Sequence, residues 1–501
     1  MGYLKWWATL TGSALPTHAH GIVDMVVKQF GSTWQLFTGN MVDGGYNRLS
    51  IGNDGKLSLL QSRTVGGESM TMALSDIALI ELGGSPHILA VGGHASAPAL
   101  RTVHPVTGEI QFLRFLQGSA EQLQHWTQVT SVNAGGRDFL VVAQRGQDGV
   151  RVFEVGADYT LTERARVLDD GKSTLKQVSA LETVTVDGNS VVLATCAVDG
   201  GVTSLAMGPR GRLEVVDVYG ALVGAGIAGA SAVGTVEVQG ESFAVVAAAG
   251  TGTLTVLRVN HMGVMFETDH RWDNLETRFG GVQDIATFSH EGRSFVVAGG
   301  SDDGLALFEV GPGGRLYHLE SIAHQEGWTL ENVRAIEVAV IDGQAMVFAA
   351  GETLPGLTQF RIDMSRFGEV QLAQPGDTML QGTARDDHLE ATDFDITLRG
   401  GDGDDRLVAG TGLTRMWGGP GEDVFVFRPG GGRDRIMDFE PGIDRIDLSA
   451  YDMLFSIHGI AVETTEWGAR LTVQGDTIDV LSMDGSSLSA ADLGNDAFIF
   501  A

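Results

Sequence analysis

A short turn that closes on a glycine recurs along the first three quarters of this 501-residue chain at an almost constant interval. The seven glycines are Gly31, Gly84, Gly136, Gly188, Gly240, Gly292 and Gly343. Successive members are 53, 52, 52, 52, 52 and 51 residues apart. A second series keeps the same interval further along the units: Gly149, Gly201, Gly252, Gly304 and Gly356. A repeat of this length implies that each copy is one supersecondary unit that packs on its neighbours.

Each unit contains four short apolar strands. In the sixth unit they span 282–289, 294–299, 305–310 and 315–322. The first two are nearly continuous in apolar residues, as expected of strands buried on both faces, and the outer two alternate. Seven such units favour a closed ring, so the sequence predicts an all-β fold that begins with a seven-bladed β-propeller. A solenoid of stacked β units is the alternative.

We expect the propeller to occupy residues 1–374. The blades are predicted near 21–64, 73–116, 126–168, 176–219, 229–271, 281–322 and 332–372. An N-terminal strand at 3–11 is predicted to join the last blade and close the ring. Residues 369–374 lie either inside that blade or in a linker to a second domain, 375–501.

A shorter period governs residues 382–426, which divide into five nine-residue units in one unbroken phase. The eighth position is always large and apolar: Leu389, Leu398, Leu407, Met416 and Phe425. The third and fifth units fit the pattern G-G-x-G-x-D-x-U-x, in which U is apolar. This pattern is a calcium-binding β-helix repeat, since its glycines permit tight turns and its aspartate and carbonyl oxygens suit a hard cation.

The aspartate at position six occurs in alternate units only. Asp387, Asp405 and Asp423 are present, whereas Ile396 and Thr414 replace the other two. The predicted metal-binding residues are Asp387, Asp405, Asp423, Gly400, Gly401, Asp402, Gly403, Gly418, Gly419 and Gly421. The alternative is a flexible loop rich in Gly and Asp that binds no ion.

The nonads resemble those of the RTX (repeats-in-toxin) family, which coil into a parallel β-roll and hold calcium between turns i and i+2. The resemblance implies sites between Asp387 and Asp405 and between Asp405 and Asp423. The first is weakened by Thr383 and Arg385, which stand where glycine is expected. Residues 432–449 resemble the segment after the β-roll in serralysin-type secreted proteases. The ending 496–501 is similar to the C-terminal signal of type I secretion substrates.

The resemblance therefore implies calcium as cofactor, the type I secretion machinery as partner, and an extracellular or cell-surface location in a Gram-negative bacterium. We also expect no N-terminal export signal, because residues 1–16 have too short an apolar core. No apolar run approaches the length of a membrane span. Cys196 lies in an apolar, strand-like run and is expected to be buried.

The formal net charge is −30. Residues 375–501 hold 24 acidic and 9 basic residues, which gives −15, and the remaining 374 residues hold 39 and 24, which also gives −15. This acidity argues against nucleic acid and against an anionic membrane surface as partners.

Residues 144–161 and 299–316 resemble blades of lactonase-type seven-bladed propellers, although no catalytic motif accompanies them. The propeller face that holds the loops between strands four and one gathers His18, His20, His125 and His324. Loops on the same face add His94, Asp43, Asp148, Asp199, Asp302, Asp303 and Glu352. We take His18, His20 and His94 as the candidate top-face site, for a metal or for acid–base chemistry. The alternative is that the histidines are surface residues and the aspartates turn residues.

HExxH and GxSxG are both absent from the sequence. The leading hypothesis is a secreted, calcium-binding RTX protein. Its propeller would serve binding, adhesion or surface assembly with an extracellular protein, a glycan or further copies of itself. A lactonase-like or other hydrolase is the second hypothesis, and a membrane-active toxin the third.

Overall fold

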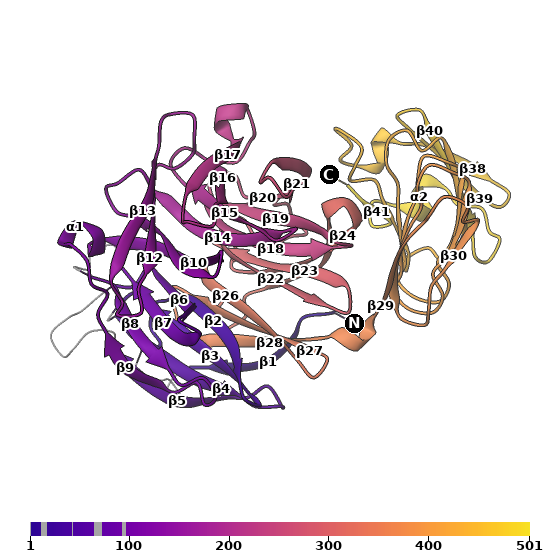
Figure 1. The fold of residues 1–501 in the computed structure, drawn as a ribbon. Helices are drawn as coiled ribbons and strands as arrows, with labels where there is room; N and C mark the ends of the chain where they lie inside the picture. Colours follow the sequence, from indigo (N-terminus) through magenta and orange to yellow (C-terminus); the bar gives the residue numbers. More distant parts are fainter. Residues whose placement is uncertain (1, 12–17, 43, 65–72, 93–96, 501) are drawn as a thin grey trace. The chain divides into compact units, whose positions relative to one another are not determined.

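The computed structural model describes all residues except 1, 12–17, 43, 65–72, 93–96 and 501. The chain divides into two compact units, Met1–Ile362 and Asp363–Ala501. The first is a seven-bladed β-propeller and the second a parallel β-roll, so the predicted all-β fold is confirmed (Figure 1). Two four-residue helices, α1 (Ala120–Leu123) and α2 (Ala490–Leu493), lie within the described residues. In that part of the chain no helix is long and apolar enough to cross a membrane.

Each blade is a four-stranded antiparallel sheet. The inner strands are β2 (Ile22–Phe30), β6 (Asp76–Leu82), β10 (Trp126–Ala134), β14 (Val178–Val186), β18 (Ala230–Val238), β22 (Val282–His290) and β26 (Val333–Ile341). The second strands are β3 (Thr33–Asn40), β7 (Ser85–Val91), β11 (Arg137–Gln144), β15 (Asn189–Cys196), β19 (Glu241–Ala248), β23 (Arg293–Gly300) and β27 (Gln344–Gly351).

The two remaining strand positions complete the blades. The third strands are β4 (Gly45–Ile51), β8 (Ala99–Val103), β12 (Gly149–Val155), β16 (Gly201–Met207), β20 (Thr253–Val259), β24 (Gly304–Gly311) and β28 (Leu357–Asp363). The outer strands are β5 (Leu57–Thr64), β9 (Ile110–Arg114), β13 (Leu161–Leu168), β17 (Leu213–Gly220), β21 (Met265–Trp272), β25 (Arg315–Ala323) and β1 (Lys5–Leu10).

Burial differs from the expectation in two respects. The second and third strands are buried on both faces, as in β19 and β24, so the prediction that the third strand alternates was wrong, whereas the outer strand β13 alternates as expected. The inner strands are only partly buried, because some of their residues line a central cavity instead of a neighbouring blade. The prediction that the first strand of each unit is buried on both faces was therefore wrong.

The seventh blade contains strands from distant parts of the chain. The N-terminal strand β1 pairs antiparallel with β28, Leu10 opposite Leu357 and Lys5 opposite Arg361. The Arg361 guanidinium lies 3.6 Å from the centre of the Trp7 ring. Because β1 fills the outer position of this blade, the segment after β28 is not needed to complete the propeller.

That segment begins the β-roll. Strand β29 (Phe367–Leu372) pairs in parallel with β31 (Asp386–Glu390), and Val370 stands opposite His388. The division between the units therefore falls after Ile362, and not after residue 374 as expected. The offset between Val370 and His388 is 18 residues, two nonads, so the coil starts before the first recognisable repeat.

The β-roll has two sheets. One has the order β29-β31-β33-β35-β37-β41 and the other β30-β32-β34-β36-β40-β39-β38. Their further members are β30 (Met379–Gln381), β32 (Ile396–Arg399), β33 (Arg406–Val408), β34 (Thr414–Trp417), β35 (Val424–Val426), β36 (Arg433–Phe439), β37 (Arg445–Asp447), β38 (Ala461–Thr465), β39 (Gly468–Val473), β40 (Asp476–Ser482) and β41 (Phe498–Ile499). The apolar residues of the nonads stack between the sheets, Leu389 on Leu407 on Phe425 and Leu398 on Met416.

Candidate functional site

Four buried aspartates follow one another along one edge of the β-roll, and we call them the aspartate ladder: Asp387, Asp405, Asp423 and Asp444. Each one's backbone N–H donates to Oδ1 of the next. The distances are 2.7 Å from Asp387 N to Asp405, 2.9 Å from Asp405 N to Asp423 and 3.1 Å from Asp423 N to Asp444. The carboxylates thus hold successive turns in register.

The two ends of the ladder differ from its middle. Oδ2 of Asp387 accepts from the Thr383 N–H at 2.6 Å and from its hydroxyl at 2.9 Å. Oδ2 of Asp444 accepts from the Glu440 N–H at 2.8 Å. By contrast, Oδ2 of Asp405 and Oδ2 of Asp423 are buried without a hydrogen-bond partner among the described residues. An unsatisfied buried carboxylate oxygen is costly unless a cation or proton neutralises it.

Glycines leave room for a cation beside these oxygens. A Cβ on Gly400 would lie 2.0 Å from Asp405 Oδ2 and 2.7 Å from the Gly418 carbonyl oxygen. A Cβ on Gly418 would lie 2.1 Å from Asp423 Oδ2. Carboxylate and carbonyl oxygens therefore converge where glycine keeps the space open, and calcium takes both kinds of ligand.

The raised pKa values of the two middle aspartates also favour a cation beside their carboxylates. Burial and then the neighbouring carboxylates, Asp387 first among them, raise the pKa of Asp405 to about 8. Burial and then the charges of Asp444 and Asp405 raise the pKa of Asp423 to about 9. A bound divalent cation would remove this repulsion and take the place of the proton.

The other predicted ligands divide into two groups. Gly401 and Gly419 have φ of 129° and 104°, and a Cβ on either would lie within 2.0 Å of a carbonyl oxygen two turns earlier. Gly403 and Gly421 also have positive φ and pack as closely. These glycines build the turns, whereas the Asp402 side chain is exposed and lies outside the ladder. No group of three or more His, Cys, Asp or Glu side chains in the described part of the chain is arranged to hold a metal ion.

A second row of acidic residues runs beside the ladder. The Asp404 N–H donates to Asp386 Oδ1 and the Glu422 N–H to Asp404 Oδ1, both at 3.0 Å. In this row an arginine of the chain supplies the positive charge. Arg366 Nη2 lies 2.8 Å from Asp404 Oδ2 and 3.2 Å from Asp386 Oδ2. The opposite edge of the roll has Ile396 and Thr414 at position six, and Thr414 N donates to Asp434 Oδ1 at 2.8 Å.

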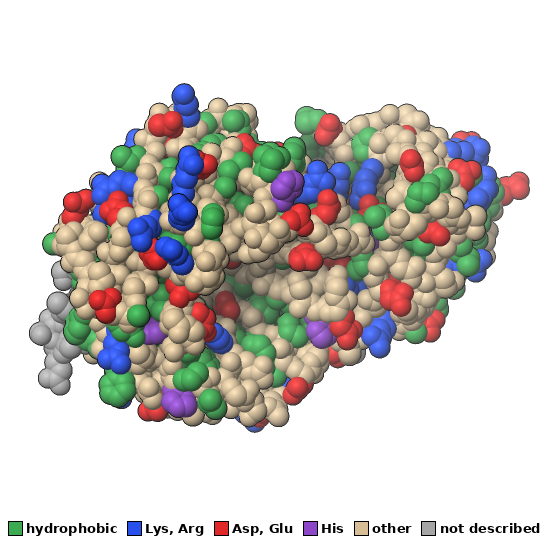
Figure 2. Space-filling model, viewed as in Figure 1, with side chains coloured by type: hydrophobic (Ala, Val, Ile, Leu, Met, Phe, Trp, Pro, Cys, Tyr) green, Lys and Arg blue, Asp and Glu red, His purple; other side chains and the backbone are tan. Residues whose placement is uncertain are grey.

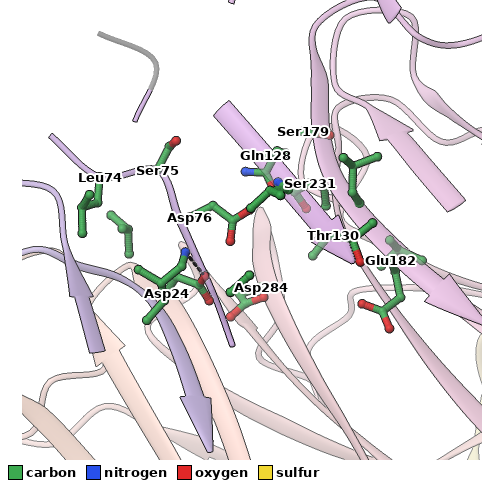
Figure 3. Close-up of a pocket in the computed structure, with 18 of the residues that line it drawn as sticks. Asp24, Leu74, Ser75, Asp76, Gln128, Thr130, Ser179, Glu182, Ser231 and Asp284 are labelled. Atoms are coloured by element: carbon green, nitrogen blue, oxygen red, sulfur yellow. Dashed lines mark hydrogen bonds between the residues drawn. The ribbon is translucent and has the colours of Figure 1, made fainter. Parts of the chain in front are cut away.

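The propeller contains a central cavity of about 790 Å³, lined mainly by its inner strands. Asp24, Asp76 and Asp284 gather on one side of it, and Glu182 reaches in from another (Figure 3). With Glu337 of β26 we call these five residues the channel carboxylates.

Four channel carboxylates join neighbouring blades. Each accepts the backbone N–H of the next inner strand: Asp24 from Ile77 at 2.8 Å, Asp76 from Val129 at 2.8 Å, Asp284 from Ile336 at 2.7 Å and Glu337 from Val27 at 3.2 Å. Inner strands have an unpaired edge, so these bonds satisfy donors that would otherwise face the channel.

Burial raises the pKa of these acids. It brings the pKa of Asp284 and of Glu182 to about 7 and that of Glu337 to about 8. Burial, and then repulsion from Asp76, raises the pKa of Asp24 well above its usual range. Burial in the channel therefore favours the protonated form of these carboxyls. Sequence reasoning missed them, although Asp24 and Asp76 are one 52-residue period apart and Asp284 four periods further on.

Two of the three histidines predicted for the top-face site, His18 and His20, lie within the described residues. His18 is buried, its ring lies against Gly45, and its carbonyl accepts from Asn47 Nδ2 at 2.6 Å. His20 is exposed and its carbonyl accepts from Asn40 Nδ2. His94 lies outside the described residues. Cys196 is buried as expected, and its thiol donates to the Lys176 carbonyl oxygen at 2.7 Å.

Solved structures with a similar fold share little sequence with this chain. A functionally unknown protein from Desulfotomaculum acetoxidans is 12% identical, with 62% of this chain and 92% of that chain covered and a TM-score of 0.44. A periplasmic gluconolactonase from Pseudomonas aeruginosa is 18% identical, with 57% and 82% covered and a TM-score of 0.44. Neither likeness says anything about activity. No curated protein matches the sequence at a significant level.

The C-terminal unit has a family match. Residues 395–481 match the family described as Peptidase M10 serralysin C terminal, from the second nonad through β39 and most of β40. This confirms the resemblance drawn from the nonads and from 432–449. The β-roll of this chain is a serralysin-type RTX domain, a kind of domain that is typical of proteins secreted by Gram-negative bacteria.

Proposed function

We propose that this chain is a secreted calcium-binding protein, in which the β-roll folds on binding calcium after export and the propeller is an extracellular binding module. The serralysin-type match supports export through the type I machinery. Extracellular calcium suits a site built from a few carboxylates and carbonyls, since such modules bind at 10⁻⁴–10⁻³ M.

One observation carries the calcium part of the proposal. Oδ2 of Asp405 and Oδ2 of Asp423 are buried, without a hydrogen-bond partner among the described residues, and next to glycines that keep space open. These two aspartates, with carbonyl oxygens of the Gly400 and Gly418 turns, would hold the ions. Calcium supplies there the positive charge that a proton otherwise provides.

The structure supports an unequal pair of sites. Between Asp405 and Asp423 both flanking turns keep their glycines. Between Asp387 and Asp405, the Thr383 N–H and hydroxyl already occupy Asp387 Oδ2. An ion there would have to displace two hydrogen bonds, so this site is the weaker one.

The binding role of the propeller, in adhesion or surface assembly, is favoured by the way its channel carboxylates are used. Four of the five accept backbone N–H groups between blades, which suits a rigid scaffold better than acid–base chemistry. The hydrolase hypothesis places its site at the top face, on His18, His20 and His94. The cavity adds Glu182, whose carboxylate points into it, as a further residue on which lactone or ester turnover would depend.

Calorimetric calcium titration of the full chain tests the proposal. Asp405→Asn removes an orphaned oxygen from the middle of the ladder and is expected to weaken calcium binding about a hundredfold or more. Asp387→Asn is expected to weaken the first site only. Asp402→Asn is the matched control, because it removes a carboxylate from the same turn but an exposed one. Equal losses in Asp402→Asn and Asp405→Asn, or no heat up to millimolar calcium, would contradict the proposal.

A further inference from the structure

The outward face of the second β-roll sheet collects arginines, and we call it the arginine face: Arg399, Arg415, Arg433, Arg435 and Arg470. They alternate along their strands with the core residues Leu398, Met416, Ile436 and Leu471. The pairing register sets Arg415 opposite Arg435, Arg435 opposite Asp479, and Asp479 opposite Arg470. Five of the nine basic residues in 375–501 thus share one face of a segment whose net charge is −15.

Three of these arginines converge on one carboxylate. Asp479 is only 2% exposed, with Arg433 Nη2 at 2.8 Å, Arg470 Nε at 2.8 Å and Arg435 Nε at 3.5 Å. Glu463 stands opposite Arg470, so three guanidinium charges meet two carboxylates and one positive charge is in excess. Asp479 also fixes the arginine side chains, so less rotamer entropy is lost when a further anion binds.

Aromatic rings stand at both ends of the arginine face. The Arg399 guanidinium lies 4.8 Å from the centre of the Trp417 ring, and that of Arg470 lies 5.9 Å from the centre of the Trp467 ring. The carboxylates close to the face are few. Glu463 stands opposite Arg470. Arg399 lies close enough to Asp438 to oppose the rise that burial causes in the pKa of that carboxyl. In Figure 2, blue side chains gather where Figure 1 draws β38 and β39.

We propose that the arginine face binds an anionic polysaccharide, one that carries carboxylate or sulfate groups. Guanidinium groups present planar pairs of donors that match such oxyanions. Neighbouring strands are about 4.8 Å apart. Arg415, Arg435 and Arg470 therefore lie in one row across the sheet, with Asp479 between the last two, and form an extended surface rather than a pocket. An extended, repeating polyanion fits a row of this kind, and the flanking indole rings offer apolar faces to its sugar rings.

The acidity of the rest of the unit makes this face selective. A polyanion is repelled by the other surfaces of a segment with 24 acidic and 9 basic residues, and it is attracted only where the arginines gather. The proposal goes beyond the propeller's binding role and needs only a folded β-roll. Calcium removal is therefore expected to abolish binding indirectly.

The test uses the full chain in calcium, on a biosensor with immobilised heparin as the sulfated probe and polygalacturonate as the carboxylated one. The double variant Arg415→Gln and Arg435→Gln is expected to bind about tenfold more weakly and with a shallower salt dependence. Arg415→Lys keeps the charge but loses the planar fork, so an intermediate affinity is expected. Arg212→Gln removes a 78% exposed propeller arginine and is expected to leave affinity unchanged.

Two outcomes would overturn the inference. One is equal binding by the double variant and the wild type to both polysaccharides. The other is tighter binding to phosphatidylglycerol vesicles or single-stranded DNA than to either polysaccharide. The calcium titration of the double variant is expected to equal that of the wild type, which separates a failure here from a failure of the calcium proposal. If the double variant does not fold, Arg415→Gln alone, whose arginine lies outside the Asp479 cluster, makes the same comparison.

Discussion

The propeller channel and the aspartate ladder both bury a row of carboxylates, and they neutralise it differently. In the channel, four carboxylates accept backbone N–H groups from the next blade, and burial raises their pKa values, which favours the protonated form. In the ladder, Oδ1 of each aspartate accepts a backbone N–H, but Oδ2 of Asp405 and of Asp423 finds no partner among the described residues. Burial favours protonation in both regions, but only the ladder leaves a second oxygen of two carboxylates without a partner among the described residues.

Topology explains the difference. A propeller is a closed ring, so every inner strand has a neighbouring blade whose N–H a carboxylate can accept. A β-roll is an open stack, and only its ends can be closed by side chains or loops. Thr383 closes one end of the ladder and the Glu440 N–H closes the other. In the middle turns, Oδ2 of Asp405 and Oδ2 of Asp423 lie without a partner among the described residues and close to glycine turns, and calcium accepts such carboxylate and carbonyl oxygens as ligands.

Calcium removal is expected to have the largest effect, and it should separate the two regions. In excess chelator, amides of β33 and β35 are expected to lose protection from hydrogen exchange by at least about a hundredfold, because a ligand at a hundred times its Kd contributes about 2.7 kcal/mol. Amides of the propeller strands should exchange as before. Hydrogen exchange followed by mass spectrometry measures both in one sample. Magnesium is expected to restore little, since it prefers a stricter octahedral geometry.

A loss of protection spread evenly over both units would break the comparison, because it would mean that the propeller depends on the cation as well. If the amides of β33 and β35 kept their protection from hydrogen exchange, the aspartates of the ladder would be neutralised by protons, as in the channel, and would need no cation.

The two sequence repeats explain how much of the fold and of the aspartate ladder could be predicted. The 52-residue glycine spacing gives seven blades, and the nonad phase gives the β-roll and the alternation of Asp387, Asp405 and Asp423. These features are periodic, so one sequence is enough to find them. The channel carboxylates are harder to predict, because an acidic residue in a strand usually indicates an exposed face. The 52-residue series that contains Asp24, Asp76 and Asp284 is also interrupted, by Gln128, Ala180 and Ala232.

Other features depend on contacts that no spacing encodes. Asp444 extends the ladder from a loop 21 residues after Asp423, outside the nonad phase. The hydrogen bond from the Thr383 hydroxyl to Asp387 depends on the conformation of one side chain. Strand β29 has no glycine-rich turn before it, so its place in the β-roll is evident only from its pairing with β31.

The second prediction concerns pH and the propeller alone. Asp284 and Glu337 have folded-state pKa values of about 7 and about 8, raised by burial above those of the unfolded chain. Their stabilising contribution is full below about pH 4 and is lost as pH rises through about 7 to 8. In chelator, the propeller is therefore expected to melt about 5 °C lower at pH 9 than at pH 6.

A double variant with Asp284→Asn and Glu337→Gln should lose a large part of this dependence, because the amides still accept the Ile336 and Val27 N–H groups but do not ionise. Calorimetric melting at several pH values measures it. Glu81→Gln is the control, since Glu81 is a half-exposed acid of an inner strand that pairs with Lys28. If the double variant kept the full pH dependence, other groups of the channel, Glu182 and the Asp24–Asp76 pair among them, would have to account for it.

The smallest expected effect concerns Arg366, which joins Asp386 and Asp404 beside the ladder and gives that row a fixed positive charge. Arg366→Gln should destabilise the calcium-loaded β-roll by about 1 kcal/mol, the range of a partly exposed ion pair, and lower its melting temperature by about 3 °C. Arg366→Lys should recover part of the loss. The effect is expected to persist in calcium at any concentration, because Asp386 and Asp404 are not among the proposed calcium ligands. If saturating calcium abolished the difference between Arg366→Gln and the wild type, the two acidic rows would form one site.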